Sequence, residues 1–358
     1  MERNLTTGSI RKNIFYFSLP YLLSYFLQTL YGMADLFIIG QFEGAAGTTA
    51  VSIGSQVMHM ITVIIVGLAM GTTVSIAQAV GAKDKKQASR CTGNTITLFL
   101  GVSVVLMVIL LLLVKPIVLV MSTPFEAVSG TVAYLTICFI GIPFIIAYNI
   151  ISSIFRGLGD SKSPMYFIAV ACAANIALDY LFMGALHLGP SGAALGTTLS
   201  QTLSVILALI AIRKRDTGIR LTRSDLSPQT AVMGQILKIG VPIALQDGFI
   251  QIAFIIITII ANRRGLEAAA AVGIVEKIIS FLFLIPSSML STVSALGAQN
   301  IGAGKPKRAI ATLGYAIAIA TALGVAIVAA VQLTAEPLVA LFTDSARADG
   351  ALVRAFAG

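Results

Sequence analysis

The sequence contains few charged residues. Only 11% of its 358 residues are Asp, Glu, Lys or Arg, whereas hydrophobic residues make up 57% and the mean hydropathy is +0.94. A soluble protein carries about 25% charged residues, which cover its water-facing surface. The composition therefore excludes a soluble enzyme, a nucleic-acid-binding module and a disordered chain, and it indicates a polytopic membrane protein.

The chain also lacks the patterns of several kinds of site. Its three cysteines show neither pairing nor metal-ligand spacing, so no disulfide framework or zinc site is predicted. No Gly-x-x-x-x-Gly-Lys-Ser/Thr phosphate loop occurs, which argues against an ATP-driven pump of that type. The segment Gly157-Leu-Gly-Asp160 matches the motif of intramembrane aspartyl proteases, but Asp160 stands between Arg156 and Lys162, where we expect a cytoplasmic turn. We predict that the chain is not an enzyme and carries no cofactor.

Long apolar runs fill most of the chain. A membrane-spanning helix needs roughly 20 mainly apolar residues, because the hydrocarbon core of a bilayer is about 30 Å thick. Backbone polar groups do not stay unpaired in lipid, so runs of this length are expected to be helical. The sequence therefore predicts an all-α protein with nine membrane-spanning helices, at approximately residues 14–40, 51–80, 92–114, 129–154, 164–186, 192–212, 236–261, 268–298 and 309–331.

The net charge of +9 comes from short basic clusters between these runs. If the N-terminus is cytoplasmic, 18 of the 24 Lys and Arg residues fall on the cytoplasmic side, five fall on the outer side, and Lys277 lies within a span. Cytoplasmic loops of membrane proteins carry an excess of Lys and Arg. We therefore expect a multi-pass protein of the cell inner (plasma) membrane with a cytoplasmic N-terminus.

An internal repeat relates the two halves of the chain. A shift of 221 residues lays Gln78 and Gly81 on Gln299 and Gly302, within a matching Gln-x-x-Gly-Ala-x-x-x-Lys pattern. Six spans separate equivalent points, so both copies enter the membrane in the same direction, as in the parallel repeats of secondary transporters. The sequence predicts two six-helix lobes around a central cleft: residues 1–212 form the first lobe, residues 213–235 a cytoplasmic linker, and residues 236–358 an incomplete second lobe, with nine of twelve expected helices present.

Acidic residues within the spans are candidate functional residues. A charge at bilayer depth costs at least about 2.5–3.5 kcal/mol on insertion scales. Asp35 and Asp179 both fall in the outer halves of outward-running helices, and Asn175 lies one turn before Asp179 on the same helix face. Two carboxylates and an amide at one depth suit a proton or a small cation such as sodium. The alternative is that each acid is close enough to the interface to be solvated.

A second set of polar residues falls in the second lobe. Asp247 stands between Gln246 and Gln251 near the inner half of its span, and Glu276 lies in the following span. A buried polar cluster of this kind is a candidate substrate-binding site. The alternatives are a solvated entrance for Asp247 and a structural contact with another helix for Glu276.

Several segments taken together resemble one transporter family. They are Leu19-Pro20, Tyr31-Gly-Met-Ala-Asp35-Leu-Phe-Ile-Ile-Gly40, Ala77-Gln-Ala-Val-Gly81-Ala, Phe155-Arg-Gly-Leu-Gly-Asp160-Ser-Lys, Asn175-Ile-Ala-Leu-Asp179 and Gly189-Pro-Ser-Gly-Ala-Ala-Leu-Gly-Thr197 in the first lobe, and Gly240-Val-Pro242 and Gly297-Ala-Gln-Asn-Ile-Gly302-Ala-Gly-Lys in the second. In combination they resemble the multidrug and toxic compound extrusion (MATE) family, over essentially the whole chain.

The resemblance implies a twelve-helix fold and a secondary antiporter. Members of the family exchange sodium ions or protons for cationic or amphipathic drug-like compounds. In some members a polar network in the first lobe holds the coupling ion. The matching positions in this sequence are Asp35, Tyr134, Asn175, Asp179 and Thr197.

We therefore expect an antiporter that exports a cationic small molecule. Its expected partners are that substrate and the lipid bilayer; no nucleic acid is expected, and the protein is expected to be a monomer. One rival function is a lipid-linked oligosaccharide flippase, which would need a strongly cationic cleft for its pyrophosphate. An intramembrane enzyme and a channel are weaker alternatives.

Overall fold

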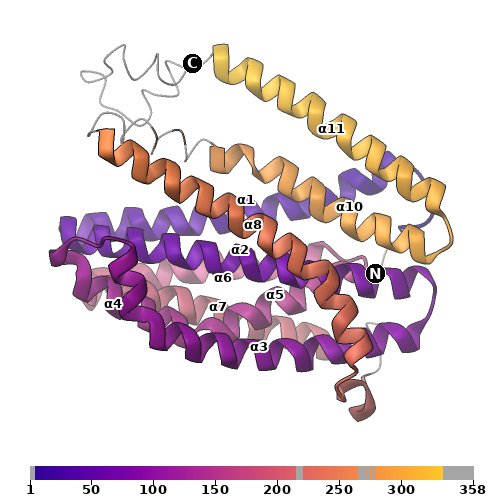
Figure 1. The fold of residues 1–358 in the computed structure, drawn as a ribbon, viewed down its shortest axis with the longest axis horizontal. Coiled ribbons are helices and arrows are strands. Elements are labelled where there is room, and N and C mark those ends of the chain that lie inside the picture. Colours follow the sequence, from indigo (N-terminus) through magenta and orange to yellow (C-terminus); the bar gives the residue numbers. More distant parts are fainter. Residues whose placement is uncertain (1–4, 215–220, 265–271, 273–274, 276–278, 334–358) are drawn as a thin grey trace.

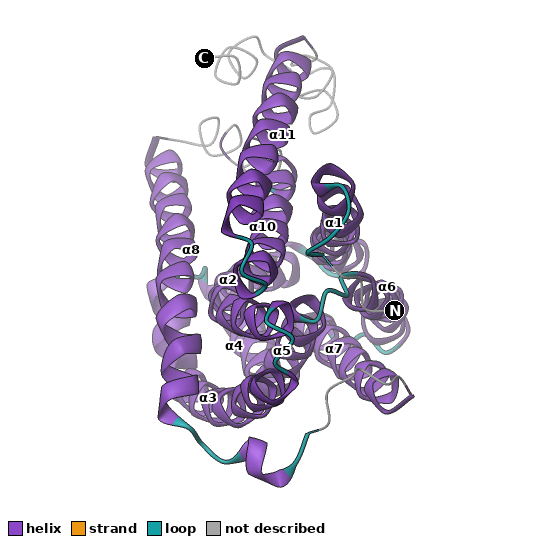
Figure 2. Ribbon diagram, turned by 90° about the vertical axis from the view of Figure 1, so that its right-hand side faces the viewer, coloured by secondary structure: helices purple, strands orange, loops and turns teal. Residues whose placement is uncertain are grey.

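The computed structural model describes residues 5–214, 221–264, 272, 275 and 279–333 (Figure 1). Within these ranges the regular structure is helical and contains no strand. The helices run side by side along the long axis of the molecule, which is the arrangement expected of a bundle that crosses a membrane (Figures 1 and 2).

In the described part of the chain, eight helices are long and apolar enough to cross a membrane, and one bent pair adds a ninth. They occur at the predicted runs, although residues 268–271, 273–274 and 276–278 of the run predicted at 268–298 lie outside the described residues. The elements are α1 (Ile10–Phe42), α2 (Ala45–Gly81), α3 (Lys85–Val120), the bent pair α4 (Phe125–Ile140) and α5 (Ile142–Gly157), α6 (Lys162–Asp179) with the π-helix η1 (Tyr180–Ala185), α7 (Gly189–Lys214), the short 3-10 helix η2 (Arg223–Leu226), α8 (Thr230–Arg264), α10 (Leu284–Gly302) and α11 (Pro306–Leu333).

The run at 129–154 is a broken span rather than one straight helix. Its halves, α4 and α5, meet at Gly141 with a bend of 49°. Pro143 stands in the first turn of α5, and proline has no backbone N–H to continue the hydrogen bonds of a preceding helix. The bend therefore has a local cause in the sequence, although the apolar run itself is continuous.

Helix α2 is the centre of the molecule. Its apolar window is 61% buried, the highest fraction among the candidate spans of the described chain. It packs against α1, α3, α4 and α5 of the first lobe and against α8 and α10 of the second (Figure 2). Small residues permit the close approach to α8: a side chain at Gly67 would collide with the backbone of Ala244. Helix α2 thus joins the two lobes.

The predicted repeat is visible where α2 crosses α10. A Cβ atom at Gly81 would collide with the backbone carbonyl of Gln299, and a Cβ atom at Gly302 would collide with that of Gln78. The four residues are the ones that the 221-residue shift places on one another. The contact is therefore reciprocal, as in an interface related by a two-fold axis. We call these four residues the lobe crossing.

Further contacts join the lobes at the same, predicted cytoplasmic end. The Lys305 side chain donates a hydrogen bond to the carbonyl of Thr6 (3.0 Å), and the Arg308 guanidinium donates to the carbonyls of Thr7 (3.0 Å) and Gly8 (2.8 Å). The Leu5 side chain is buried in an apolar cluster with residues of α1, α10 and α11. The segment before α1 is therefore held against the second lobe.

Asp160 lies in the turn between α5 and α6, as the sequence predicts. Its carboxylate accepts hydrogen bonds from the backbone N–H groups of Lys162 and Ser163, both at 3.0 Å. A carboxylate that accepts from the first free N–H groups of a helix stabilises that end. Asp160 therefore caps α6.

Arg156 differs from its expected environment. The charge pattern places it among the cytoplasmic basic residues, but in the structure it occupies the last turn of α5 and is only 6% exposed. Its guanidinium stacks on the ring of Tyr21 in α1, 4.1 Å from the ring centroid. A planar guanidinium is stabilised by stacking on an aromatic face, so this charge is buried rather than solvated.

Candidate ion-coupling site

Asp35 and Asp179, which we call the acid pair, lie together inside the first lobe. Asp35 stands two turns before the end of α1 and is 2% exposed, and Asp179 is the last residue of α6 and is fully buried. Neither side chain is therefore solvated, which removes the alternative that each acid sits in water at the interface. Burial of a carboxylate requires partners that compensate its charge.

Neutral polar groups surround the acid pair. The Thr197 hydroxyl of α7 donates a hydrogen bond to Asp35 Oδ2 (3.2 Å). The side chains of Asp179 and Asn175 lie beside the Asp35 carboxylate, close enough to interact with it. The structure thus brings four of the five residues of the predicted network into one cluster.

The end of α6 is shaped around the acid pair. Asn175 and Asp179 are one turn apart and face the same side of the helix. The helix then continues as the π-helix η1 from Tyr180 to Ala185. Such wider turns are rare in helices and often mark functional sites. Here the change of helix type begins at the residue after Asp179.

Gly196 of α7 permits the approach of the acid pair to the helix backbone. A Cβ atom at this position would collide with Asp179 Oδ1 and would come 3.6 Å from Asn175 Nδ2. Any larger residue at this position would therefore displace the Asp179 carboxylate from its place beside α7. The sequence analysis missed this role, although Gly196 directly precedes Thr197 in the quoted motif.

Tyr31 is the other member of the cluster that the sequence analysis missed. It lies one turn before Asp35 on α1, close enough to interact electrostatically with the Asp35 carboxylate, and the Gln201 side chain of α7 lies nearby. The i, i+4 spacing of Tyr31 and Asp35 was the available signal.

Tyr134 differs from the network that the resemblance implies. Its hydroxyl shares a hydrogen bond with Ser55 of α2 (3.1 Å), and its ring covers Gly54. It is buried and close enough to Asp35 to feel its charge. In this conformation the hydroxyl is therefore directed to α2.

Several polar atoms of the cluster have no hydrogen-bond partner. They are Asp35 Oδ1, both carboxylate oxygens of Asp179, and both side-chain atoms of Asn175. Buried polar atoms are normally paired, and orphaned ones call for an explanation such as a bound ion. Two neighbouring carboxylates also repel one another unless a proton or a cation reduces their charge. The cluster is therefore suited to a proton or a small cation.

The ligand types of the cluster suit a hard cation such as sodium. Carboxylate and amide oxygens suit hard cations. Within the described ranges no three His, Cys, Asp or Glu side chains form a metal-binding group, so the acid pair supplies two charges at most. Asp35, Asn175 and Asp179 are the residues that would hold a sodium ion.

The predicted substrate-binding residues are less closely associated. Asp247 and Gln251 are half-buried on α8, and Gln246 is exposed. No hydrogen bond joins the three side chains where the structure describes them. Glu276 lies outside the described residues. Their role in substrate binding stays a prediction.

We expect the Gly196→Ala substitution to impair transport without preventing folding. Its Cβ atom would displace the Asp179 carboxylate from Asn175, whereas alanine favours the α7 helix by about 1 kcal/mol over glycine. Transport should fall severalfold at an unchanged protein level. A matched control is Gly101→Ala in α3, where a Cβ atom meets nothing within 4 Å. Equal transport by the two variants would contradict this role of Gly196.

The comparisons with known proteins agree with the fold. The chain matches the family described as MatE over residues 20–181 and 242–355. It is 30% identical over 306 residues to the probable multidrug resistance protein YpnP of Bacillus subtilis, covering 85% of this chain and 68% of that protein. It is 26% identical over 341 residues to the probable multidrug resistance protein NorM of Thermotoga maritima, covering 94% and 73%.

Solved structures show the same architecture. The chain superimposes with a TM-score of 0.89 and 27% identity on an outward-facing multidrug resistance MATE family transporter of the MOP superfamily, covering 99% of this chain and 79% of that chain. A MOP superfamily transporter from Pyrococcus furiosus gives the same values. The chain thus spans about two thirds to four fifths of the length of these relatives. Its two matched segments, its helical bundle and its repeat show that it belongs to the MATE family of membrane transporters.

Proposed function

We propose that the protein exports cationic or amphipathic compounds in exchange for a sodium ion or a proton held by the acid pair. The observation that carries the proposal is the set of unpaired, buried polar atoms on Asp35, Asp179 and Asn175. Similar proteins are named as multidrug resistance or multidrug export proteins, which supports the choice of cargo.

Coupling requires that the ion favours one conformation of the transporter. The described contacts between the lobes include the lobe crossing and the Lys305 and Arg308 hydrogen bonds, all at the predicted cytoplasmic end. The acid pair lies toward the opposite end. An ion that binds between these buried carboxylates would alter the packing of α1, α6 and α7, the helices that supply the surrounding groups. An ion with equal affinity for both conformations would not shift the equilibrium between them.

The acidic character of the spans supports a cationic cargo. Away from their ends, the described spans contain the carboxylates of Asp35, Asp179 and Asp247. Glu126 lies in the first turn of α4, and the buried Arg156 lies at the end of α5. A flippase for a lipid-linked oligosaccharide would instead need a cationic cleft to hold its pyrophosphate. The two functions are separated by their cargo in the experiment below.

Dye transport by the full-length gene product in proteoliposomes tests the proposal. We expect ethidium export against its gradient when an inward sodium or proton gradient is imposed, and none when both gradients are absent. Imposing the two gradients separately identifies the coupling ion. Export that is indifferent to both gradients would contradict the antiport. Movement of a fluorescent lipid-linked oligosaccharide in place of the dye would favour the flippase.

A further inference from the structure

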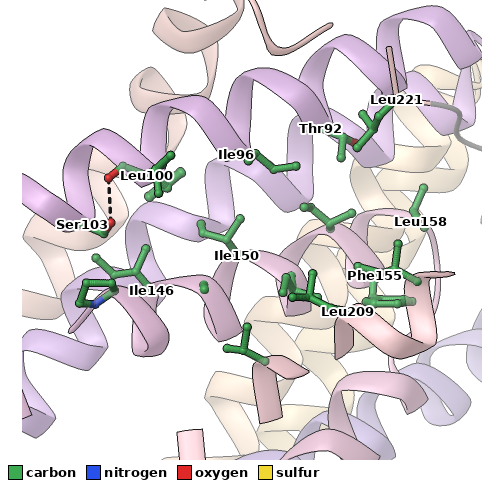
Figure 3. Close-up of a pocket in the computed structure, with 17 residues that line it drawn as sticks. Thr92, Ile96, Leu100, Ser103, Ile146, Ile150, Phe155, Leu158, Leu209 and Leu221 are labelled. Atoms are coloured by element: carbon green, nitrogen blue, oxygen red, sulfur yellow. Dashed lines mark hydrogen bonds between the residues drawn. The ribbon is translucent and has the colours of Figure 1, made fainter. Parts of the chain in front are cut away.

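An apolar groove opens on the first lobe, away from the acid pair (Figure 3). Its volume is about 310 Å³, at the lower end of the range for ligand pockets. Helix α5 forms its floor, with Ile150 and Phe155, while α3 and α7 form its walls, with Ile96 and Leu209. Leu221 of the linker also lines it. We call this cavity the groove.

The groove offers almost nothing to a polar ligand. Two of its lining residues carry hydroxyls, and both donate to carbonyls of their own helix: Thr92 to Ala88 (2.9 Å) and Ser103 to Leu100 (2.7 Å; Figure 3). The remaining lining side chains are hydrocarbon or aromatic. Burial of apolar surface is therefore the interaction that the groove supplies, and a hydrocarbon chain is the ligand that matches it.

Basic residues stand close in the chain to the lining residues at one end of the groove, the predicted cytoplasmic end. Arg213 and Lys214 are exposed at the end of α7, directly after the lining residue Ile212. Arg90 lies two residues before Thr92 on α3, and the exposed Arg223 lies two residues after Leu221. Basic pockets between membrane helices on the cytoplasmic side bind the headgroups of anionic lipids.

The linker is fastened to α3 beside the groove. The fully buried Asn94 donates from its amide to the carbonyl of Asp225 (3.2 Å) and accepts from the backbone N–H of Gln229 (2.7 Å). The Thr97 hydroxyl donates to the carbonyl of Leu226 (2.7 Å). We call these hydrogen bonds the linker clasp. They hold η2 against α3 at Asn94, which lies four residues after Arg90. Leu221 is thereby kept over the groove.

The turn that carries Leu221 is also stabilised internally. The Asp225 carboxylate accepts hydrogen bonds from the hydroxyl (2.6 Å) and the backbone N–H (2.9 Å) of Thr222. These bonds lower the pKa of Asp225 below its usual value, with smaller contributions from Arg90 and Lys86. Because the pKa of Asp225 is lowered in the folded protein, its carboxylate stabilises the fold at pH values above its usual pKa of about 3.9. This stabilisation is lost only as the pH falls through the lowered pKa. The turn is therefore intact at neutral pH.

We propose that the groove is a binding site for an anionic phospholipid of the cytoplasmic leaflet, whose acyl chain fills the groove and whose headgroup contacts Arg213, Lys214, Arg90 and Arg223. The lipid would connect α7, the linker and α3. The site is separate from the acid pair and uses none of its residues.

The absence of tryptophan from the sequence permits a direct test. The Leu209→Trp variant of the 358-residue chain carries one tryptophan, inside the groove, where phospholipids with brominated acyl chains quench its fluorescence. A matched control is Tyr166→Trp on α6, which is 58% exposed and stands about as far from the cytoplasmic end of its helix. The protein is reconstituted in phosphatidylcholine vesicles that contain either brominated phosphatidylglycerol or brominated phosphatidylcholine at equal mole fraction.

We expect phosphatidylglycerol to bind at the groove about fivefold more tightly than phosphatidylcholine, or more, because each nearby Lys or Arg favours an anionic lipid. At Tyr166→Trp the two lipids should quench equally. Adding Arg213→Gln and Lys214→Gln to Leu209→Trp should remove the preference but leave the quenching. Adding Ala147→Phe, which fills the floor of the groove, should reduce quenching by both lipids.

Equal quenching by the two lipids at Leu209→Trp would show an ordinary lipid boundary and would overturn the proposal. Absence of quenching would show that acyl chains do not enter the groove, with the same consequence. If Leu209→Trp does not fold, Ile96→Trp on the opposite wall provides a second reporter, for which the same results are expected.

Discussion

Asn substitution of either member of the acid pair is expected to reduce ion-driven export to the rate of empty liposomes. Asn has nearly the shape of Asp but carries no charge, so α1 and α6 should still insert and pack. The buried cluster would lose one of the two carboxylates that bind the cation or exchange the proton. Asp35→Asn and Asp179→Asn should therefore be produced at normal levels and retain binding of ethidium in the absence of a gradient.

The double substitution should be no worse than either single one. Residues that act as a unit in one step are not additive, since loss of either member already removes the step. If each carboxylate instead contributed independently, the double variant would lose the product of the two single effects. Efflux rates of the three variants at equal protein levels distinguish these cases.

A matched control is Asp160→Asn. Asp160 is also an acid near the end of a first-lobe helix, but it caps α6 in a turn, and Asn retains the capping function. Export by Asp160→Asn should be normal. Normal export by both Asp35→Asn and Asp179→Asn would place the coupling site elsewhere, and Asp247 of α8 would be the next candidate.

The membrane topology of the fold could be predicted from the sequence because its causes are local. Nine runs of sufficient length dictate helices in lipid, and their positions agree with the described helices. The repeat was readable because Gln78 and Gly81 recur as Gln299 and Gly302, and the same four residues form the lobe crossing. The break at Gly141 was not predicted, since hydropathy does not register a change of direction.

The candidate site could be predicted only in part, because its contacts join helices far apart in the chain. Asp35 and Asp179 were found through the cost of placing a charge in the membrane. Gly196 carries no such signal: its role depends on the Asp179 carboxylate lying against α7. The Tyr134 hydroxyl, which resemblance alone assigned to the network, is hydrogen-bonded to Ser55.

The Gly302→Ala substitution at the lobe crossing is expected to destabilise the protein. The added Cβ atom would meet the backbone carbonyl of Gln78, which cannot move aside as the tip of a side chain can. Overpacking of this kind costs about 1–3 kcal/mol. We expect the unfolding temperature in detergent to fall by several degrees, measured by size-exclusion chromatography after heating.

The reciprocity of the lobe crossing makes this prediction sharper. Gly81→Ala would meet the carbonyl of Gln299 in the same way, so its unfolding temperature should fall by a similar amount. Gly297→Ala lies on α10 with nothing within 4 Å of its Cβ atom and should gain up to about 1 kcal/mol from helix propensity.

The lobe crossing must separate if the cytoplasmic end is to open, so a Cβ atom there also disfavours the closed conformation. A thiol reagent should therefore label a cysteine introduced at Leu5, which is buried against α10 and α11, faster in Gly302→Ala than in Gly297→Ala. Equal labelling rates together with equal unfolding temperatures would refute the close contact of α2 and α10.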